Sequence, residues 1–317
     1  MPTITLRDYG NGIYAIDAGY VRHLLAAIHL IVDQGRVAII DTGTNASLGR
    51  VTTTLTQLGL DPTSVDFVVL THIHLDHAGG AGGMMQEFPS ARLVVHPRGA
   101  RHMVDPANLM RATEDVYGKE KAQALYGKLI PVPSERVIEA HDEFRLQLGE
   151  RELVCYDAPG HAKHHIFIHD IVANGIFSGD AFGISYRELD VDNRPFLFPT
   201  TSPAQFDPIA MRNSIERMVA LNPESMYLTH YSRIRPPRSL ANDVLRRMDA
   251  FVGITNQVIG KCPESAVPAI HEAMKSYLLS EARNHGITLS DQEILSVCEL
   301  DLKLNAEGAA IWAQQTK

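Results

Sequence analysis

The sequence predicts an α/β fold in which a β-rich core is followed by a helical C-terminal extension. Short runs of β-branched and apolar residues dominate the first half of the 317-residue chain. After Pro236-Pro237 no convincing strand follows, and apolar residues recur at helical spacing instead. These two observations predict a core domain over residues 1–238 and a helical extension over residues 239–317 that packs on the core.

The predicted strands of the core are runs in which Val, Ile, Phe and Tyr are concentrated between turn-forming residues. They are Ile13–Asp17, Ala27–Val32, Val37–Ile40, Phe67–Leu70, Arg92–Val95, Phe144–Leu148, Arg151–Tyr156, Ile166–Ile168 and Ile176–Ser178.

Helical patterns separate these runs. One helix is predicted from Thr44 to about Leu58, and a second opens at Asp207-Pro208, where an N-cap residue precedes proline at the first helical position. Residues 106–128 show weaker helical periodicity, so a lid and an ordinary surface insertion both stay open. In the extension we expect three helices. Apolar residues at helical spacing indicate two of them, over Leu240–Val252 and Val267–Leu278, and a capping box of Ser290 with Glu293 indicates the start of the third.

Composition argues against several classes of protein. The formal net charge is −8 and the pI is near 6.0, which disfavours nucleic acid as a partner because binders of nucleic acid usually carry a basic patch. The longest apolar stretch, Leu24–Val32, is too short to cross a bilayer, and no signal peptide is visible. Cys155, Cys262 and Cys298 form no CxxC pair. We therefore expect a cytoplasmic protein that acts on a small molecule, with a homodimer left open.

Four metal-capable side chains follow one predicted strand. The apolar run Val68–Leu70 leads into Thr71, His72, Ile73, His74, Leu75, Asp76 and His77. In extended chain, residues two apart point to the same side, so His72 and His74 share a face. Packing alone does not explain such a string, because buried polar groups are costly unless they are paired. Imidazole and carboxylate ligands suit zinc, and also manganese or iron.

This His-x-His-x-Asp-His string resembles that of the metallo-β-lactamase superfamily. Further matches follow in the family's order from about Ile13 to Tyr231, namely Asp41-Thr42-Gly43, Pro159-Gly160-His161, Ser178-Gly179-Asp180 and Thr229-His230. The resemblance implies an αββα sandwich with a dinuclear metal site at one edge of the two sheets. It also implies that C-terminal helices lie beside the site, as in the glyoxalase II branch.

The resemblance also implies a role for each ligand. One metal ion would take His72, His74 and His161, the other would take Asp76, His77 and His230, and Asp180 would bridge both. Asp180 stands where the zinc β-lactamases commonly have cysteine, which argues against lactam antibiotics as substrates. Asp76 is the candidate to orient the nucleophile, and Asp41 is either a support for a ligand loop or a plain turn residue. His164 and His165 are expected to be structural or solvent-facing.

Two divalent ions about 3.5–4 Å apart can activate water and stabilise a developing oxyanion, which suits esters, thioesters, lactones and phosphodiesters. Candidate substrate contacts lie on loops expected near the site, and loop packing is the competing interpretation for each of them: Tyr20, His23, Phe182, Tyr186 and Arg187. Signal-lactone hydrolases of the superfamily place tyrosine where Gly183 stands.

Three other functions stay open. An iron persulfide dioxygenase would hold one metal ion through His72, His161 and Asp180. A phosphodiesterase or nuclease of the tRNA-processing kind is disfavoured by the acidic charge balance. A ligand-sensing regulator with residual hydrolase activity is not distinguished by the sequence.

Overall fold

The computed structural model describes residues 5–201, 204–261 and 266–316, which fall into two compact units. The sheet unit comprises Met1–Asp157, His164–Gly179 and Thr229–Ser232, and the helical unit comprises Ala158–Lys163, Asp180–Leu228 and Arg233–Lys317. The chain thus passes between the units several times. This division differs from the predicted boundary at residues 238 and 239, which stays a prediction about where the extension begins.

The first sheet has seven strands in chain order. They are β1 (Leu6–Asp8), β2 (Ile13–Asp17), β3 (Ala27–Asp33), β4 (Arg36–Ile40), β5 (Val65–Val69), β6 (Arg92–Val95) and β7 (Val137–Glu139). β1 to β4 pair antiparallel, whereas β4 to β7 pair parallel. The central strands are buried on both faces, which is why they read as continuous apolar runs.

Of the second sheet, the sheet unit holds four antiparallel strands. Their order is β11 (Gly175–Gly179), β10 (Ile166–Asp170), β9 (Arg151–Asp157) and β8 (Phe144–Leu148). The two sheets pack face to face, since the ring of His29 on β3 meets the ring of Phe177 on β11 edge-on at 5.3 Å. All the predicted strand segments are confirmed, while four short strands are not among them: β1 and β7 here, and β12 and β13 near residue 230.

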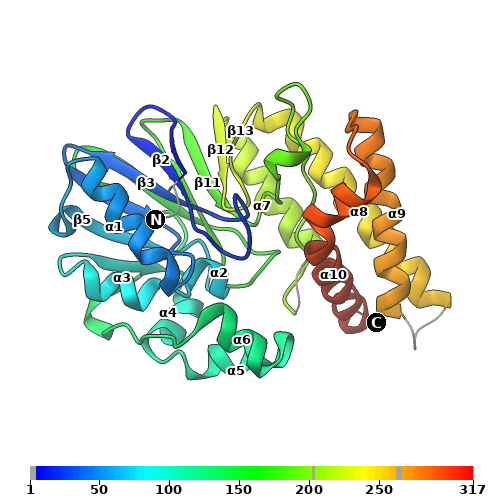
Figure 1. The fold of residues 1–317 in the computed structure, drawn as a ribbon, viewed down its shortest axis with the longest axis horizontal. Coiled ribbons are helices and arrows are strands. Elements are labelled where there is room, and N and C mark those ends of the chain that lie inside the picture. Colours follow the sequence, from blue (N-terminus) through cyan, green and yellow to red (C-terminus); the bar gives the residue numbers. More distant parts are fainter. Residues whose placement is uncertain (1–4, 202–203, 262–265, 317) are drawn as a thin grey trace. The chain divides into compact units, whose positions relative to one another are not determined.

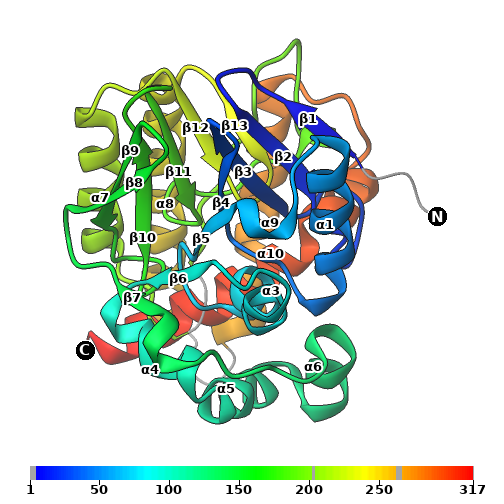
Figure 2. The ribbon, with the colours of Figure 1, turned by 90° about the vertical axis from the view of Figure 1, so that its left-hand side faces the viewer.

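Helices cover this pair of sheets in the sheet unit (Figures 1 and 2). α1 (Leu48–Gln57) and α3 (Ala81–Glu87) pack against the first sheet, and the one-turn helix α2 (Leu75–Ala78) precedes α3. α4 (Pro97–Val104) leads into the insertion of residues 106–128, which is the helical hairpin α5 (Ala107–Tyr117) and α6 (Lys119–Tyr126). No residue of α5 is buried.

The helical unit contains α7 (Pro208–Ala220), β12 (Ser225–Leu228), most of β13 (Ser232–Ile234), α8 (Pro237–Lys261), α9 (Ala266–His285) and α10 (Asp291–Gln315). The last three helices pack on one another, as Figure 1 shows in yellow to red, and α8 also packs on α7. Ser290 and Glu293 form the predicted capping box of α10. Cys262 lies outside the described residues.

The fold is therefore a mixed α/β arrangement of two sheets flanked by helices, with additional C-terminal helices, as predicted. Within the described ranges, no helix is both long and apolar enough to cross a membrane.

Candidate metal centre

The His-x-His-x-Asp-His string begins where β5 ends. His74 is the N-cap of α2 and has an extended backbone, while Asp76 and His77 lie in one helical turn. The glycine at position 80 has a steric reason, because a Cβ on Gly80 would lie 2.7 Å from the carbonyl oxygen of Thr44. Close approach of this backbone to the turn after β4 thus requires glycine.

Asp76, His77 and His230 converge in the sheet unit. Oδ2 of Asp76 lies 3.6 Å from Nε2 of His77 and 3.4 Å from Nε2 of His230. Nδ1 of His230 lies 2.7 Å from the carbonyl oxygen of Leu25, which can only accept, so Nδ1 is the protonated nitrogen. In the neutral ring Nε2 is then unprotonated, which is the state required of a metal ligand.

Asp41 fixes the same tautomer in His77 and forms hydrogen bonds with three separate segments of the chain. Its Oδ2 lies 2.8 Å from Nδ1 of His77 and accepts from the hydroxyl of Thr229 at 2.8 Å. The main-chain N–H and the hydroxyl of Thr71 donate to the same carboxylate at 2.8 and 2.9 Å. Asp41 is buried and has a positive φ of 58°. It is therefore more than a turn residue, because it orients a candidate ligand through a hydrogen bond.

Thr71 and Thr229 were missed by the sequence analysis. Their sequence positions did point to the site, because each threonine directly precedes a candidate ligand, in Thr71-His72 and in Thr229-His230. The local sequence does not show that both hydroxyls meet one carboxylate.

Buried imidazoles surround the first two histidines of the string. Nε2 of His72 lies 2.9 Å from Nδ1 of His74, and the ring of His165 stacks on His72 at 4.8 Å. Nδ1 of His164 accepts from the main-chain N–H of Ile73 at 3.4 Å. Burial, followed by the neighbouring His74, lowers the pKa of His164 to about 3. Both His164 and His165 are buried, so of the two expected roles the structural one fits and the solvent-facing one does not.

His161 and Asp180 lie together in the helical unit. Nε2 of His161 is 3.5 Å from Oδ2 of Asp180, and both residues are buried. The turn before His161 is fixed because the N–H of Asp207 donates to the carbonyl oxygen of Gly160 at 2.8 Å. A Cβ at Gly160 would lie 2.3 Å from Cα of Met211, so α7 packs directly on this turn.

Two of the candidate substrate contacts belong to the sheet unit. The hydroxyl of Tyr20 lies 2.6 Å from the hydroxyl of Tyr126, the last residue of α6. The His23 side chain is 64% exposed and its Nδ1 lies 3.0 Å from Oδ2 of Asp17.

The other candidates belong to the helical unit. Phe182 and Tyr186 are buried there, and the Tyr186 hydroxyl donates to Asp301 of α10 at 3.0 Å. Arg187 donates to the carbonyl oxygen of Ser185 at 2.7 Å. These contacts favour packing, and the substrate roles of all five residues stay predictions.

Two face-to-face sheets flanked by helices, with clustered imidazole and carboxylate groups at a strand end, define the class as a metallo-β-lactamase-like fold. The chain belongs to the metallo-β-lactamase superfamily, whose family model matches residues 23–230.

Its relatives agree with this assignment. The metallo-β-lactamase fold-containing protein ST1585 of Sulfurisphaera tokodaii is 23% identical over 84% of this chain and 98% of the relative. The solved structure of ST1585 covers 94% of this chain and 98% of its own with a TM-score of 0.65 and 21% identity. A hydroxyacylglutathione hydrolase of Stenotrophomonas maltophilia is 32% identical over 48% of this chain and 44% of its own length.

Proposed function

We propose that the chain is a dinuclear metal-dependent hydrolase of an ester-, thioester- or lactone-like small molecule. The observation that carries the proposal is the convergence of Asp76, His77 and His230, with both histidines held in the tautomer that a ligand needs. Membership of a superfamily composed largely of metallo-hydrolases supports it. The ligand set fits zinc, and manganese or iron in second place.

A second ion would be held by His72 and His74 together with His161, and Asp180 would be a ligand of both ions. Three features support this set: the family order of the motifs, the contact of His72 with His74, and the contact of His161 with Asp180. When bound, the ions would lower the pKa of a water molecule and stabilise negative charge on the substrate. Asp76 would orient that water and accept its proton, while Asp41 keeps His77 in place.

Two curated relatives support a thioester, because both are hydroxyacylglutathione hydrolases. Aspartate rather than cysteine at position 180 argues against a lactam. A ribonuclease of Thermus thermophilus, TTHA0252, is 29% identical over 57% of this chain and 40% of its own, which makes a phosphodiester the alternative to test.

The test is turnover by protein that has been stripped with a chelator and reloaded with zinc, manganese or iron. The panel contains p-nitrophenyl esters, lactones, thioesters and bis-p-nitrophenyl phosphate. We expect metal-dependent turnover of an ester or thioester, and none by the stripped protein. Turnover of the phosphodiester alone would replace the proposal with the nuclease, and oxygen consumption with a persulfide would replace it with the dioxygenase.

A further inference from the structure

Thr200 contacts both candidate ligands of the helical unit. Its hydroxyl donates to the main-chain carbonyl oxygen of Asp180 at 3.0 Å, and its own carbonyl oxygen lies 3.5 Å from Nδ1 of His161. A carbonyl oxygen can only accept, so Nδ1 carries the hydrogen and Nε2 is unprotonated in the neutral ring. Nε2 then faces the carboxylate of Asp180 at 3.5 Å, and two acceptors at this separation suit a bound cation.

Asn305 of α10 holds the residues on both sides of Thr200. Its side-chain nitrogen donates to the carbonyl oxygen of Pro199 at 2.9 Å, and its side-chain oxygen accepts from the main-chain N–H of Thr201 at 2.5 Å. The hydroxyl of Thr201 donates to the main-chain carbonyl oxygen of Asn305 at 2.8 Å. Because both neighbours of Thr200 are bonded to one residue of α10, the position of Thr200 is fixed by that helix.

This contact requires an amide side chain. An amide has both a donor and an acceptor, so one side chain can pair with a carbonyl oxygen and an N–H group at the same time. Asn305 is 2% exposed and lies among buried apolar residues of α10 such as Leu302 and Ala306. A buried amide is costly unless it is hydrogen-bonded, and asparagine is a weaker helix former than alanine. Packing of α10 alone therefore does not explain asparagine at this position.

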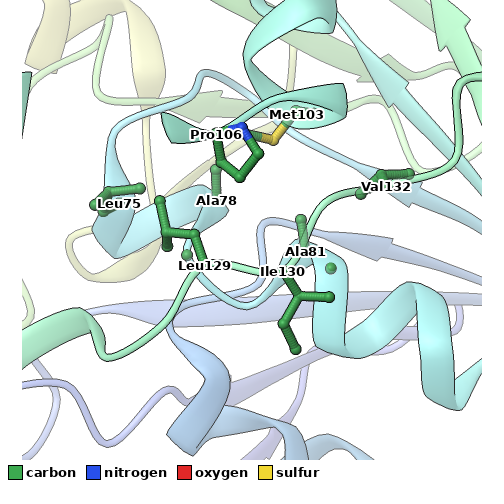
Figure 3. Close-up of a pocket in the computed structure, with 10 residues that line it drawn as sticks. Leu75, Ala78, Ala81, Met103, Pro106, Leu129, Ile130 and Val132 are labelled. Carbon is green, nitrogen blue, oxygen red and sulfur yellow. The ribbon is translucent and has the colours of Figure 1, made fainter. Parts of the chain in front are cut away.

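The candidate ligands in the sheet unit have supports of their own. α2 carries Asp76 and His77, and Asp41 orients His77. The segment after α6 lies beside the same helix, where Leu129 and Ile130 line a small pocket together with residues of α2 (Figure 3). A change in α10 is therefore expected to act on the ligands of the helical unit and not on these.

We propose that Asn305 is a positioning residue for the metal centre. Through Thr200 it sets the orientation of His161 and Asp180, so α10 determines how tightly the ion at these two ligands is held. This inference rests on the proposed function, because it assigns His161 and Asp180 to a metal ion.

The test compares two truncations of buried side chains in α10. Asn305→Ala removes the amide and introduces a good helix former. Leu302→Ala is the matched control, because Leu302 is buried one turn earlier and its side chain has no polar atom. Asn305→Leu is a second variant that keeps the volume of the side chain. Stripped proteins are titrated with zinc against a chromophoric chelator, cobalt(II) absorption reports the ligand geometry, and urea unfolding of the stripped proteins measures stability.

We expect both Asn305 variants to lower the affinity for one of two zinc ions about tenfold or more, the effect typical of residues behind a ligand. The affinity for the other ion should stay within about twofold of wild type, and the cobalt(II) spectrum of the weakened site should change. In His161→Ala, which lacks a ligand of the weakened ion, adding Asn305→Ala should have no further effect on the ion that remains. Leu302→Ala should lower stability and keep both affinities.

Unchanged zinc affinities in both Asn305 variants, or the same selective loss in Leu302→Ala, would overturn the inference alone. Failure of both Asn305 variants to fold would also overturn it, because the residue would then serve the fold. A single zinc ion in wild type would overturn the dinuclear function, and the inference then stands if Asn305→Ala weakens that ion and falls if it does not. A chain that takes up no metal would overturn both proposals.

Discussion

Nδ1 of His77 lies 2.8 Å from Oδ2 of Asp41, and the same carboxylate accepts hydrogen bonds from Thr71 and Thr229. One buried side chain after β4 thus orients a residue in α2 and the residues that precede His72 and His230. Carboxylates behind ligating histidines fix the ring orientation and raise ligand basicity.

We predict that Asp41→Asn lowers metal affinity about 10- to 100-fold, because asparagine has a single accepting oxygen and cannot accept from both His77 and the main-chain N–H of Thr71. Competition with a chromophoric chelator measures this on metal-stripped protein. Asp249→Asn is the control, since it removes a carboxylate that pairs with Arg212 on the exposed surface at 2.6 Å and should leave affinity unchanged. If a folded Asp41→Asn protein binds metal as tightly as wild type, Asp41 acts only as a turn residue.

A second prediction concerns the turn before His161. Gly160 has a φ of +133°, and its Cβ would lie 2.3 Å from Cα and N of Met211, so Gly160→Ala should lower the free energy of unfolding by at least about 2 kcal/mol. Gly253→Ala is the matched control, because nothing lies within 4 Å of a Cβ there and the residue is inside α8. That control should raise stability by about 0.5–1 kcal/mol. If urea unfolding shows that both substitutions change the free energy of unfolding in the same direction, the packing argument is refuted.

The third prediction concerns acid stability. Burial lowers the pKa of His29 to about 4 in the folded protein, against the partly opposing charge of Asp41, whereas the unfolded value is about 6.5. The folded state therefore binds this proton less readily than the unfolded state. The contribution to stability is fully present above pH 6.5 and is lost as the pH falls from 6.5 to about 4, by about 3 kcal/mol over the whole window.

Replacing His29 with glutamine should make the loss of stability between pH 7 and pH 4.5 smaller than in wild type. Glutamine can still contact Ser232, whose hydroxyl lies 3.2 Å from Nε2 of His29. Urea unfolding at the two pH values measures the effect. Identical losses in both proteins would show that His29 does not titrate in this way.

The fourth prediction concerns the C-terminal helices. Leu240, Val244, Met248 and Phe251 form the buried stripe of α8, which packs on α7. A chain ending before Leu240 should expose the apolar face of α7, bind a hydrophobic dye and aggregate on size-exclusion chromatography. A truncated chain that elutes as a soluble monomer without dye binding would contradict this expectation.

Local patterns predicted the strands and most helices because those signals lie within a few residues of one another. The His-x-His-x-Asp-His string was also local, as were the turns that carry His161 and Asp180. Contacts between distant segments were invisible, as in the meeting of Tyr20 with Tyr126 and of Thr229 with Asp41. β1, β7, β12 and β13 were missed because they are only three or four residues long, so their sequences carry little apolar periodicity.

The central claim is that two metal ions bind, bridged by Asp180. Asp180→Asn keeps the size of the side chain but removes a negative charge and one of its two oxygens as a ligand. The most direct measurement is metal content per chain in wild type and Asp180→Asn, after stripping, reloading and removal of excess metal. The account predicts two equivalents in wild type, with one lost or markedly weakened in the variant. A single tightly bound ion in wild type that stays single when metal is added, and is retained in full by Asp180→Asn, would contradict it.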